Sequence, residues 1–320
     1  MKVLVTGATG FIGSFLVEAL SKKGYEVTCL VRNRSNRRWL RHLRLQYLLG
    51  DLDNTDSYAE KLGAFGYIYH LAGLTKADSA RDFYHANAEC TQILVAAAAE
   101  MNPALKRFLH VSSLAAAGPS FDGIPLIEDA PAAPVSDYGK SKLEGEKAVL
   151  SFKGMLPVTI VRPPAVFGPR DADFLYVFRA VQNRLFPYWG KSSYSLIYVE
   201  DLVRGIILAA EKEEAAEKVY YLADSRIYTN DDILSTISST LGRRAFRLRL
   251  PRKILPVLAL LLQKVQKKGI INPDKIQEIR YPHWICDPAR ALKELGFHSE
   301  TPLGEGFKKT ADWYRKEKWL

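Results

Sequence analysis

Short apolar runs alternate along the chain with longer segments in which apolar residues recur every three or four positions. The runs have the length and composition of buried parallel strands. They lie at 2–6, 27–31, 45–49, 67–71 and 108–111. Helical spacing follows the first run, in Phe11, Ile12, Phe15, Leu16, Ala19 and Leu20. It returns in an alanine-rich segment that we expect to begin at Asn87 and to end near Glu100. Strands that alternate with helices predict an α/β fold with a doubly wound parallel sheet.

Three glycines separate the first predicted strand from the first predicted helix. Gly7, Gly10 and Gly13 follow one another at intervals of three residues. A strand that enters a helix through such a turn presents free backbone N–H groups and the positive end of the helix dipole to an anion. The spacing differs from the G-x-G-x-x-G fingerprint, so an ordinary strand-to-helix turn is the alternative. The strand, helix and strand around the glycines favour a site for the pyrophosphate of a dinucleotide.

The end of the second strand bears on the choice of cofactor. In a doubly wound sheet an acidic residue there hydrogen-bonds the ribose of NAD, whereas arginine accommodates the 2′-phosphate of NADP. Here the strand ends at Val31 and Arg32 without an acidic residue, and Arg34 and Arg37 follow. We therefore predict NADP(H) in preference to NAD(H), with Arg32 as the main phosphate ligand. A solvated basic face is the alternative.

Two further strand ends carry polar or small residues. Asp51 follows the third run, where its carboxylate could accept from the adenine amino group or merely cap the next helix. Leu71, Ala72 and Gly73 follow the fourth run and leave room for a flat cofactor. His70 could act as a base, but we favour a hydrogen-bonded histidine of the core.

Tyr138 and Lys142 lie four residues apart, so they share one face of a predicted helix. A tyrosine has an ordinary pKa of about 10 and is a poor base at neutral pH. A nearby ammonium, together with a cationic nicotinamide, would favour the phenolate. The pair alone is also common on solvated helices, so it needs support from other residues.

Composition limits the class of function. The 320 residues carry a formal net charge of +10. The densest basic stretch, 32–44, follows the second strand, so we expect it to serve an anionic cofactor rather than nucleic acid.

The three cysteines are far apart and show no disulfide or metal spacing, and we expect no metal. No signal peptide or apolar stretch of membrane-spanning length is visible, which predicts a cytoplasmic location.

Several motifs follow one another along the chain: TGATGFIG at 6–13, HLAG at 70–73, Asn87, VSS at 111–113 and YGKSK at 138–142. Further motifs are RPPAVFGPRD at 162–171, YVEDLV at 198–203 and WICDPARALKELGF at 284–297. In this ordered set the chain resembles the extended short-chain dehydrogenase/reductases. That superfamily includes NAD-dependent epimerase/dehydratases, 3β-hydroxysteroid dehydrogenases and dihydroflavonol reductases.

The resemblance implies a catalytic set of Ser113, Tyr138 and Lys142, with Asn87 supporting a proton relay. Tyr138 would exchange a proton with the substrate oxygen, Ser113 would hydrogen-bond that oxygen, and Lys142 would bind the nicotinamide ribose. We choose Ser113 over the serine before it because it lies five residues before Gly118, as the catalytic serine of the family lies before its glycine. The implied cofactor contacts are Gly7, Thr9, Gly10, Phe11, Ile12, Gly13, Arg32, Arg34, Asp51, Leu52, Leu71, Ala72, Gly73, Val111, Tyr138, Lys142 and Pro164.

The chain departs from the relatives that act on nucleotide sugars. Ala165 replaces an asparagine that commonly meets the sugar diphosphate, and Tyr194 stands where a basic residue is common. Leu114 and Ala115 replace the Asp-Glu pair of dehydratases, so dehydration is not expected. Three cations could still bind phosphate: Lys191, Arg170 and Arg179.

We therefore predict an NAD(P)(H)-dependent oxidoreductase that interconverts a secondary alcohol and a ketone on a lipophilic small molecule. A nucleotide-sugar epimerase that oxidises its substrate transiently is one alternative. A non-catalytic dinucleotide-sensing protein is the second.

We expect a dinucleotide-binding domain over 1–167, to which 196–222 returns, and a substrate lobe from 168–195 and 223–320. Between clusters of cations, 251–268 predicts an apolar helix. It could pack in the lobe, roof a substrate pocket or rest weakly on an anionic membrane surface. Pairing of the alanine-rich helix and the catalytic helix across a two-fold axis would make a homodimer, and a monomer is equally compatible.

Overall fold

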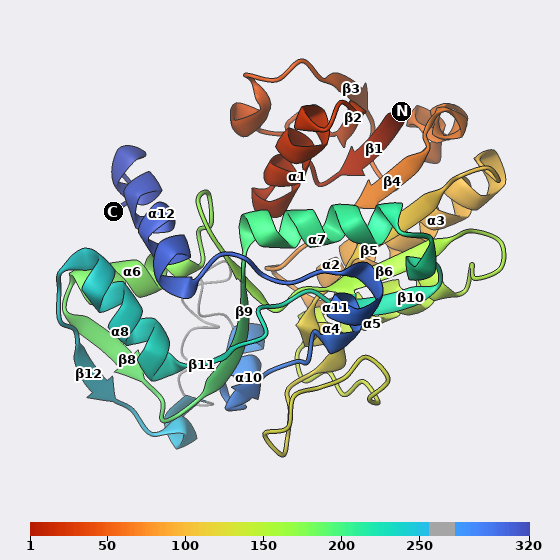
Figure 1. Cartoon of the computed structure of the whole chain (residues 1–320). Coiled ribbons are helices and arrows are strands. Elements are labelled where there is room, and N and C mark those ends of the chain that lie inside the picture. Colours follow the sequence, from red (N-terminus) through yellow and green to blue (C-terminus); the bar gives the residue numbers. More distant parts are fainter. Residues whose placement is uncertain (256–272) are drawn as a thin grey trace.

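Seven parallel strands form the central sheet of the molecule (Figure 1). The computed structural model describes residues 1–255 and 273–320. The strands are β1 (Lys2–Thr6), β2 (Glu26–Val31), β3 (Gln46–Leu49), β4 (Tyr67–His70), β5 (Arg107–Val111), β6 (Val158–Arg162) and β10 (Lys218–Tyr221). Their spatial order, β3-β2-β1-β4-β5-β6-β10, changes direction between β1 and β4. The doubly wound α/β fold is confirmed, and the ends of the predicted strands shift by at most one residue.

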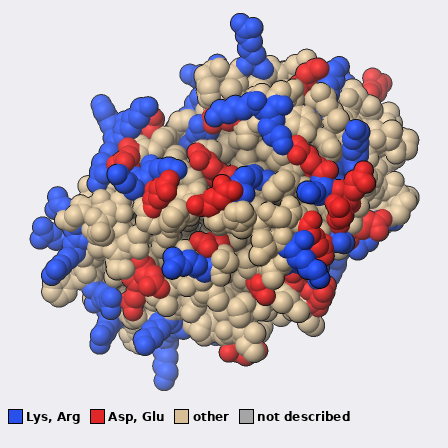
Figure 2. Space-filling view, viewed as in Figure 1, with Lys and Arg blue, Asp and Glu red and all other residues tan. Residues whose placement is uncertain are grey.

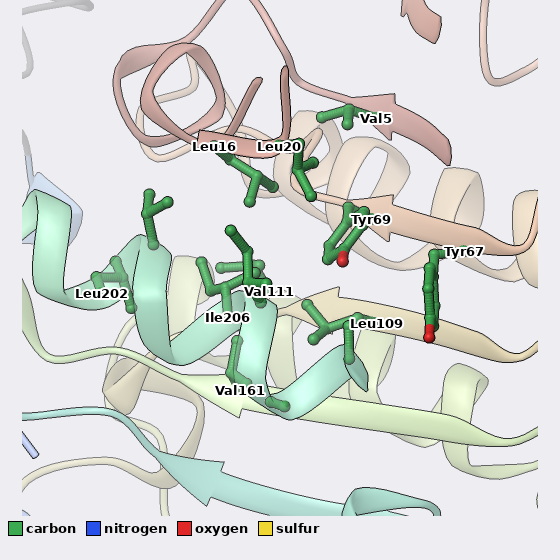
Figure 3. Packing of buried hydrophobic residues seen from close by; sticks show 14 of the residues in the cluster. Val5, Leu16, Leu20, Tyr67, Tyr69, Leu109, Val111, Val161, Leu202 and Ile206 are labelled. Atoms are coloured by element: carbon green, nitrogen blue, oxygen red, sulfur yellow. The ribbon is translucent and has the colours of Figure 1, made fainter. Parts of the chain in front are cut away.

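Four long helices cover the two faces of this sheet. They are α1 (Phe11–Lys22) and α7 (Val199–Glu211) on one face, and α3 (Cys90–Met101) and α5 (Asp137–Leu150) on the other. Successive strand residues point to opposite faces, so Val3 and Val5 pack in one hydrophobic cluster and Leu4 in the other. Figure 3 shows the first cluster, in which strand side chains such as Val111 meet Leu16 of α1 and Ile206 of α7.

The helical segment around Asn87 begins earlier than predicted. Ser79 caps α2 (Ala80–Tyr84): its hydroxyl accepts from the N–H of Asp82, whose carboxylate accepts from Ser79 N–H in return. One π-helical turn, η4 (His85–Glu89), joins α2 to α3. The prediction that Asn87 opens the helix is therefore wrong. The Ser-x-x-Asp start signal lies upstream of the alanine-rich part, and only that part directed the prediction.

A smaller lobe lies beside the large sheet, at the lower left of Figure 1. Its strands are β7 (Ala165–Phe167), β9 (Ser193–Tyr198), β11 (Ile227–Thr229) and β13 (His283–Trp284) in one sheet, and β8 (Leu185–Tyr188) and β12 (Phe246–Arg249) in another. Its helices are α6 (Phe174–Gln182), α8 (Asn230–Leu241) and α12 (Leu303–Lys316). Phe307 lies in the core of the lobe, with its ring centroid 4.7 Å from that of Phe167 and 5.6 Å from that of Phe178.

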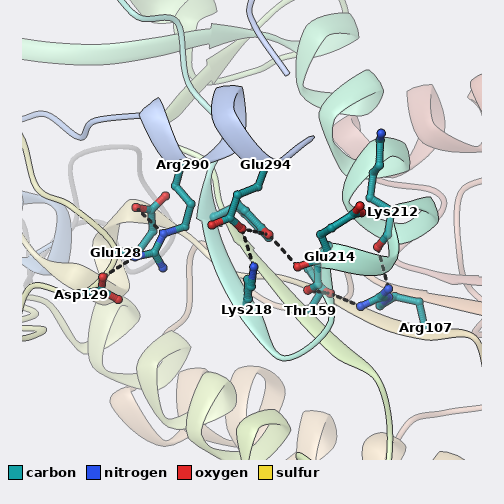
Figure 4. Close-up of polar contacts among 11 residues, drawn as sticks. Arg107, Glu128, Asp129, Thr159, Lys212, Glu214, Lys218, Arg290 and Glu294 are labelled. Atoms are coloured by element: carbon teal, nitrogen blue, oxygen red, sulfur yellow. Dashed lines mark hydrogen bonds and ion pairs between the residues drawn. The ribbon is translucent and has the colours of Figure 1, made fainter. Parts of the chain in front are cut away.

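Short helices connect these elements in the described chain. They are η1 (Arg38–Leu40), η2 (Thr55–Ser57), η3 (Ala59–Ala64), α4 (Leu114–Ala117), η5 (Glu213–Ala215), η6 (Arg252–Ile254), α10 (Pro273–Ile279) and α11 (Ala289–Leu295). Polar contacts tie α11 to the edge of the large sheet (Figure 4). Glu294 of α11 pairs with Lys218 of β10 at 2.8 Å, and Arg290 pairs with Asp129 in the loop before α5.

Residues 1–255 and 273–320 contain no helix long and apolar enough to cross a membrane. Most of the helix predicted over 251–268 lies outside these described residues, and only its beginning is seen, as η6 and Leu255. Its three interpretations therefore stay predictions.

Candidate active site

The glycine turn brings two strand ends into close contact. β1 passes into α1 through Gly7, which has a left-handed φ of +69°. A Cβ atom at Gly7 would lie 2.7 Å from the backbone nitrogen of Ala72, and one at Gly13 would lie 2.1 Å from the carbonyl oxygen of Gly7. Glycine is therefore required at both positions. Gly10 precedes the first residue of α1 and leaves the positive end of that helix open to an anion.

A cavity of about 660 Å³ opens where β1, β2 and β4 end. Nine residues that were predicted to bind the cofactor line it: Gly7, Thr9, Gly10, Arg32, Asp51, Leu52, Leu71, Ala72 and Gly73. This place is the switch point of the sheet, where doubly wound folds bind their ligands. The glycine turn suits a pyrophosphate and the arginine suits a further phosphate, so the lining fits a dinucleotide.

The other predicted cofactor contacts lie outside this lining: Phe11, Ile12, Gly13, Arg34, Val111, Tyr138, Lys142 and Pro164. Phe11 and Ile12 pack toward the core of the smaller lobe, and Arg34 is exposed. Lys142 lies next to the cavity, since a Cβ atom at Gly73 would be 4.0 Å from its Nζ atom. The cofactor contacts of all eight stay predictions.

Three cavity-lining residues carried no signal in the sequence. A carboxylate oxygen of Asp53, a ring nitrogen of His85 and the Sγ atom of Cys90 lie within 4.8 Å of one another. Cys90 Sγ donates to one carboxylate oxygen of Asp53 at 2.8 Å, and His85 Nε2 lies 3.0 Å from the other. The hydrogen bonds from Cys90 and His85 lower the pKa of Asp53. His85 and Cys90 share a helix face because of the π-helical turn η4, which spacing alone does not reveal.

Ser113 and Tyr138 meet at the end of β5. Ser113 caps α4, and its Oγ atom accepts from the N–H of Ala115 at 3.1 Å. Burial raises the pKa of Tyr138 to about 12, although a side-chain hydrogen bond with Ser113 acts in the opposite direction. The phenol is therefore protonated at neutral pH in the chain alone. The lowering of this pKa by Lys142 together with a cationic nicotinamide stays a prediction.

A distant part of the chain caps the helix that carries Tyr138. Asp274 of α10 accepts from the N–H groups of Asp137 at 2.6 Å and Tyr138 at 3.2 Å, and Glu278 accepts from Ser136 Oγ at 3.0 Å. A carboxylate at the first turn complements the helix dipole. These contacts hold the backbone of Tyr138 in place.

Lys142 is buried between α5 and β5. Its Nζ atom donates to the carbonyl oxygen of Val111 at 2.8 Å and lies 3.5 Å from Nε2 of His110. Burial lowers the pKa of Lys142 to about 8, and the carboxylate of Glu146 acts in the opposite direction. Tyr138, Lys142 and Glu146 follow at intervals of four and lie on one face of α5.

Asn87 is buried between the cavity and α5. Its Oδ1 atom accepts from the N–H of Leu74 at 2.8 Å, and its Nδ2 atom donates to Leu74 O and to Ser141 Oγ, both at 2.9 Å. The side chain thus joins the loop after β4 to the helix of Tyr138. Its part in a proton relay stays a prediction.

His70 is a histidine of the core, the reading we favoured from the sequence. Its two ring nitrogens lie 2.7 Å from Thr6 Oγ1 and 2.9 Å from Thr91 Oγ1. Burial lowers the pKa of His70 to about 3, so the ring is neutral at physiological pH and does not compete with Tyr138 as a proton donor.

A buried ion pair behind α5 yields a prediction about stability. Arg162 of β6 donates to both carboxylate oxygens of Glu146, at 2.9 and 2.6 Å, and the two side chains are 7% and 1% exposed. Arg162→Met should lower the free energy of unfolding by about 3–5 kcal/mol, because it leaves a buried carboxylate without its partner. Urea unfolding measures this loss.

Two controls separate this effect from general damage. Lys147→Met removes a surface pair with Glu144 and should change the free energy of unfolding by less than about 1 kcal/mol. The double variant Arg162→Met/Glu146→Leu should recover much of the stability, since no charge is left buried. A single variant as stable as the parent would show that the pair does not anchor α5.

The doubly wound sheet, with its glycine turn and cavity at the switch point, defines a dinucleotide-binding α/β protein. The model of the NAD dependent epimerase/dehydratase family matches residues 3–223, and the chain belongs to this family. It is an NAD(P)-dependent oxidoreductase of the extended short-chain dehydrogenase/reductase type.

Similar proteins cover nearly the whole chain. The ceramide reductase of Caulobacter vibrioides is 30% identical, over 99% of this chain and 96% of its own length. The 4-hydroxy-2-methyl-3-oxo-4-farnesyl-3,4-dihydroquinoline-1-oxide ketoreductase of Stigmatella aurantiaca is 27% identical, over 96% of this chain and 98% of its own. The structure of MoeE5 in complex with UDP-glucose and NAD is 25% identical, with a TM-score of 0.79 over 99% of this chain and 100% of that one.

Proposed function

We propose that this protein interconverts a secondary alcohol and a ketone with NADP(H), on a lipophilic small molecule. The observation that carries the proposal is the contact of Ser113 and Tyr138, with Lys142 one turn further along α5 and next to the cavity. Leu114 and Ala115 follow the serine and are buried, so no carboxylate is available there for dehydration. Two similar proteins are named as reductases of a ceramide and of a farnesyl-bearing ketone, which supports the lipophilic substrate.

In this proposal each side chain has one task. The Tyr138 phenol donates its proton to the oxygen of the substrate carbonyl during reduction, and Ser113 hydrogen-bonds the same oxygen. Lys142 holds the nicotinamide ribose. Asn87 hydrogen-bonds both the loop after β4 and α5, and so holds the two in position. NADP(H), when bound, supplies or accepts the hydride.

Two of the three cations that could have favoured a nucleotide sugar, Arg170 and Arg179, are engaged elsewhere. Arg170 pairs with Glu18 of α1 at 2.6 Å and donates to Ser14 at 3.0 Å. Arg179 donates twice to the carbonyl oxygen of Trp319. This use of both guanidinium groups argues for a substrate without a diphosphate.

The preference for NADP(H) rests on Arg32, which lines the cavity beside Ser35 at the end of β2. Arg32→Ser should raise the KM for NADPH by about 10- to 100-fold and leave that for NADH nearly unchanged, because a charge-assisted contact to phosphate is lost. Arg315→Ser is the matched control, since Arg315 is exposed on α12 and lies outside the cavity lining. Tighter binding of NADH than of NADPH by the parent protein would contradict the preference.

Net turnover of reduced nicotinamide tests the reaction. The parent protein should consume NADPH with a long-chain 3-ketoamide or with a ketone that bears an isoprenoid chain. Conversion of UDP-glucose, the nucleotide sugar bound with NAD in the MoeE5 structure, without net change in NADPH would instead support the epimerase. Dinucleotide binding without turnover of either substrate class would support a sensing protein.

A further inference from the structure

The two-stranded β8–β12 ribbon exposes an apolar face to solvent. Phe246 is paired with Leu185, and Leu248 with Pro187, so these four side chains share one face. All four are exposed, and the exposed fractions of Phe246, Leu185 and Leu248 are 82%, 51% and 45%. Large apolar side chains gathered in this way on a protein surface mark an interaction site.

The opposite face of the ribbon is used by the lobe itself. Phe186 packs against the core of the lobe. Arg247 forms an ion pair with Asp231 of α8 at 3.0 Å and lies over the ring of Tyr188, 5.5 Å from its centroid. The ribbon is therefore anchored through one face, and its apolar face is directed outward.

Basic residues flank Phe246 and Leu248 along the chain. The stretch 243–253 contains no acidic residue and six basic ones: Arg243, Arg244, Arg247, Arg249, Arg252 and Lys253. Arg243, Arg244, Arg249 and Lys253 are exposed, as is Arg184 before β8. Figure 2 shows Lys and Arg side chains gathered on the left and lower left, where Figure 1 places β8, β12 and the end of α8.

We propose that the β8–β12 ribbon docks on an anionic lipid bilayer, with its apolar face in the headgroup region and its arginines on lipid phosphates. Exposed apolar residues flanked by basic ones are the combination that binds such surfaces. A second copy of the chain fits the ribbon poorly, since it would bring two sets of like charges together. A nucleic acid would leave the aliphatic side chains of Leu185 and Leu248 in water, because it stacks on aromatic rings.

Vesicle co-sedimentation of the full chain tests this surface. The parent protein should bind vesicles of phosphatidylcholine and phosphatidylglycerol in equal parts. It should bind vesicles of phosphatidylcholine alone at least about tenfold more weakly, and added salt should weaken the binding to the mixed vesicles. No substrate is present, so the result does not depend on the proposed ketone chemistry.

Two variants divide the apolar from the basic contribution. Phe246→Ser/Leu248→Ser and Arg243→Glu/Arg244→Glu should each lower partition into the mixed vesicles by about tenfold or more. These side chains are exposed, so the thermal unfolding midpoint should stay unchanged. Lys153→Glu/Met155→Ser, at another exposed site, is the matched control and should bind like the parent.

Several results would overturn the proposal. One is the absence of binding to mixed vesicles, and another is equal binding by the parent and both ribbon variants. A dimer in size-exclusion chromatography that Phe246→Ser/Leu248→Ser disrupts would show that a second copy covers the ribbon. Binding of random-sequence DNA that this variant retains, with no vesicle binding, would assign the basic stretch to nucleic acid.

Discussion

Replacing Tyr138 by phenylalanine is expected to lower ketone reduction about a thousandfold, within the range that general acid catalysis contributes. Phenylalanine keeps the aromatic ring, whose centroid lies 5.9 Å from that of Phe83, and loses only the hydroxyl that meets Ser113. The backbone cap from Asp274 is untouched. Cofactor binding should therefore be retained, and nicotinamide fluorescence can measure it beside turnover.

The pH dependence of the parent enzyme gives a second readout. Reduction requires the protonated phenol, so its rate should fall as pH rises through the pKa of Tyr138 in the loaded enzyme. Oxidation requires the phenolate, so its rate should rise with pH through the pKa of Tyr138 in the complex with the oxidised cofactor. In the chain alone that pKa is about 12, and the positive nicotinamide of an oxidised cofactor would bring it down.

Tyr176→Phe serves as the matched control, because Tyr176 is 45% exposed on α6, and it should turn over like the parent. If Tyr138→Phe kept more than about a tenth of the activity, another group would be the proton donor. Loss of both turnover and cofactor binding would instead indicate that the substitution disturbs the cavity.

Local patterns accounted for the parts of the fold that depend on neighbours in sequence. The strand, glycine turn and helix at the N-terminus could be predicted because Gly7, Gly10 and Gly13 act within one short segment. The shared face of Tyr138 and Lys142 follows from helical spacing in the same way.

Features that depend on distant segments carried no such signal. Asp274 reaches the amide of Tyr138 from 136 residues away, and its position in the sequence does not disclose that contact. The grouping of His85 with Cys90 requires a π-helical turn, whereas a regular α-helix would place residues five apart on different faces. Asn87 was chosen by family resemblance, and its anchoring of Leu74 and Ser141 was seen only in three dimensions.

The pKa of Tyr138 shows why proximity along a helix is not enough. Lys142 lies one turn from Tyr138, but its ammonium is directed to the carbonyl oxygen of Val111. Burial then dominates and raises the pKa of the phenol. Spacing predicted the shared face, but the balance between burial and charge depends on the packed surroundings.

Gly13→Ala is expected to weaken cofactor binding by at least about a hundredfold, because the displaced turn would lose hydrogen bonds from its N–H groups to the pyrophosphate, each worth about 1.5–3 kcal/mol. The added Cβ atom would lie 2.1 Å from the carbonyl oxygen of Gly7 and 2.8 Å from its carbonyl carbon. Both contacts are with backbone, so the start of α1 must move away from the turn that would receive the pyrophosphate. Titration with NADPH measures the effect, and the thermal unfolding midpoint should fall as well.

Gly304→Ala is the matched control, since it also places a methyl group near the start of a helix. Its Cβ atom would meet only Thr236 Cγ2, at 3.8 Å, among the described residues. It should bind NADPH like the parent and be slightly more stable, because alanine is the better helix former. If Gly13→Ala bound NADPH as tightly as Gly304→Ala, the approach of α1 to the glycine turn would not be what shapes the cofactor site.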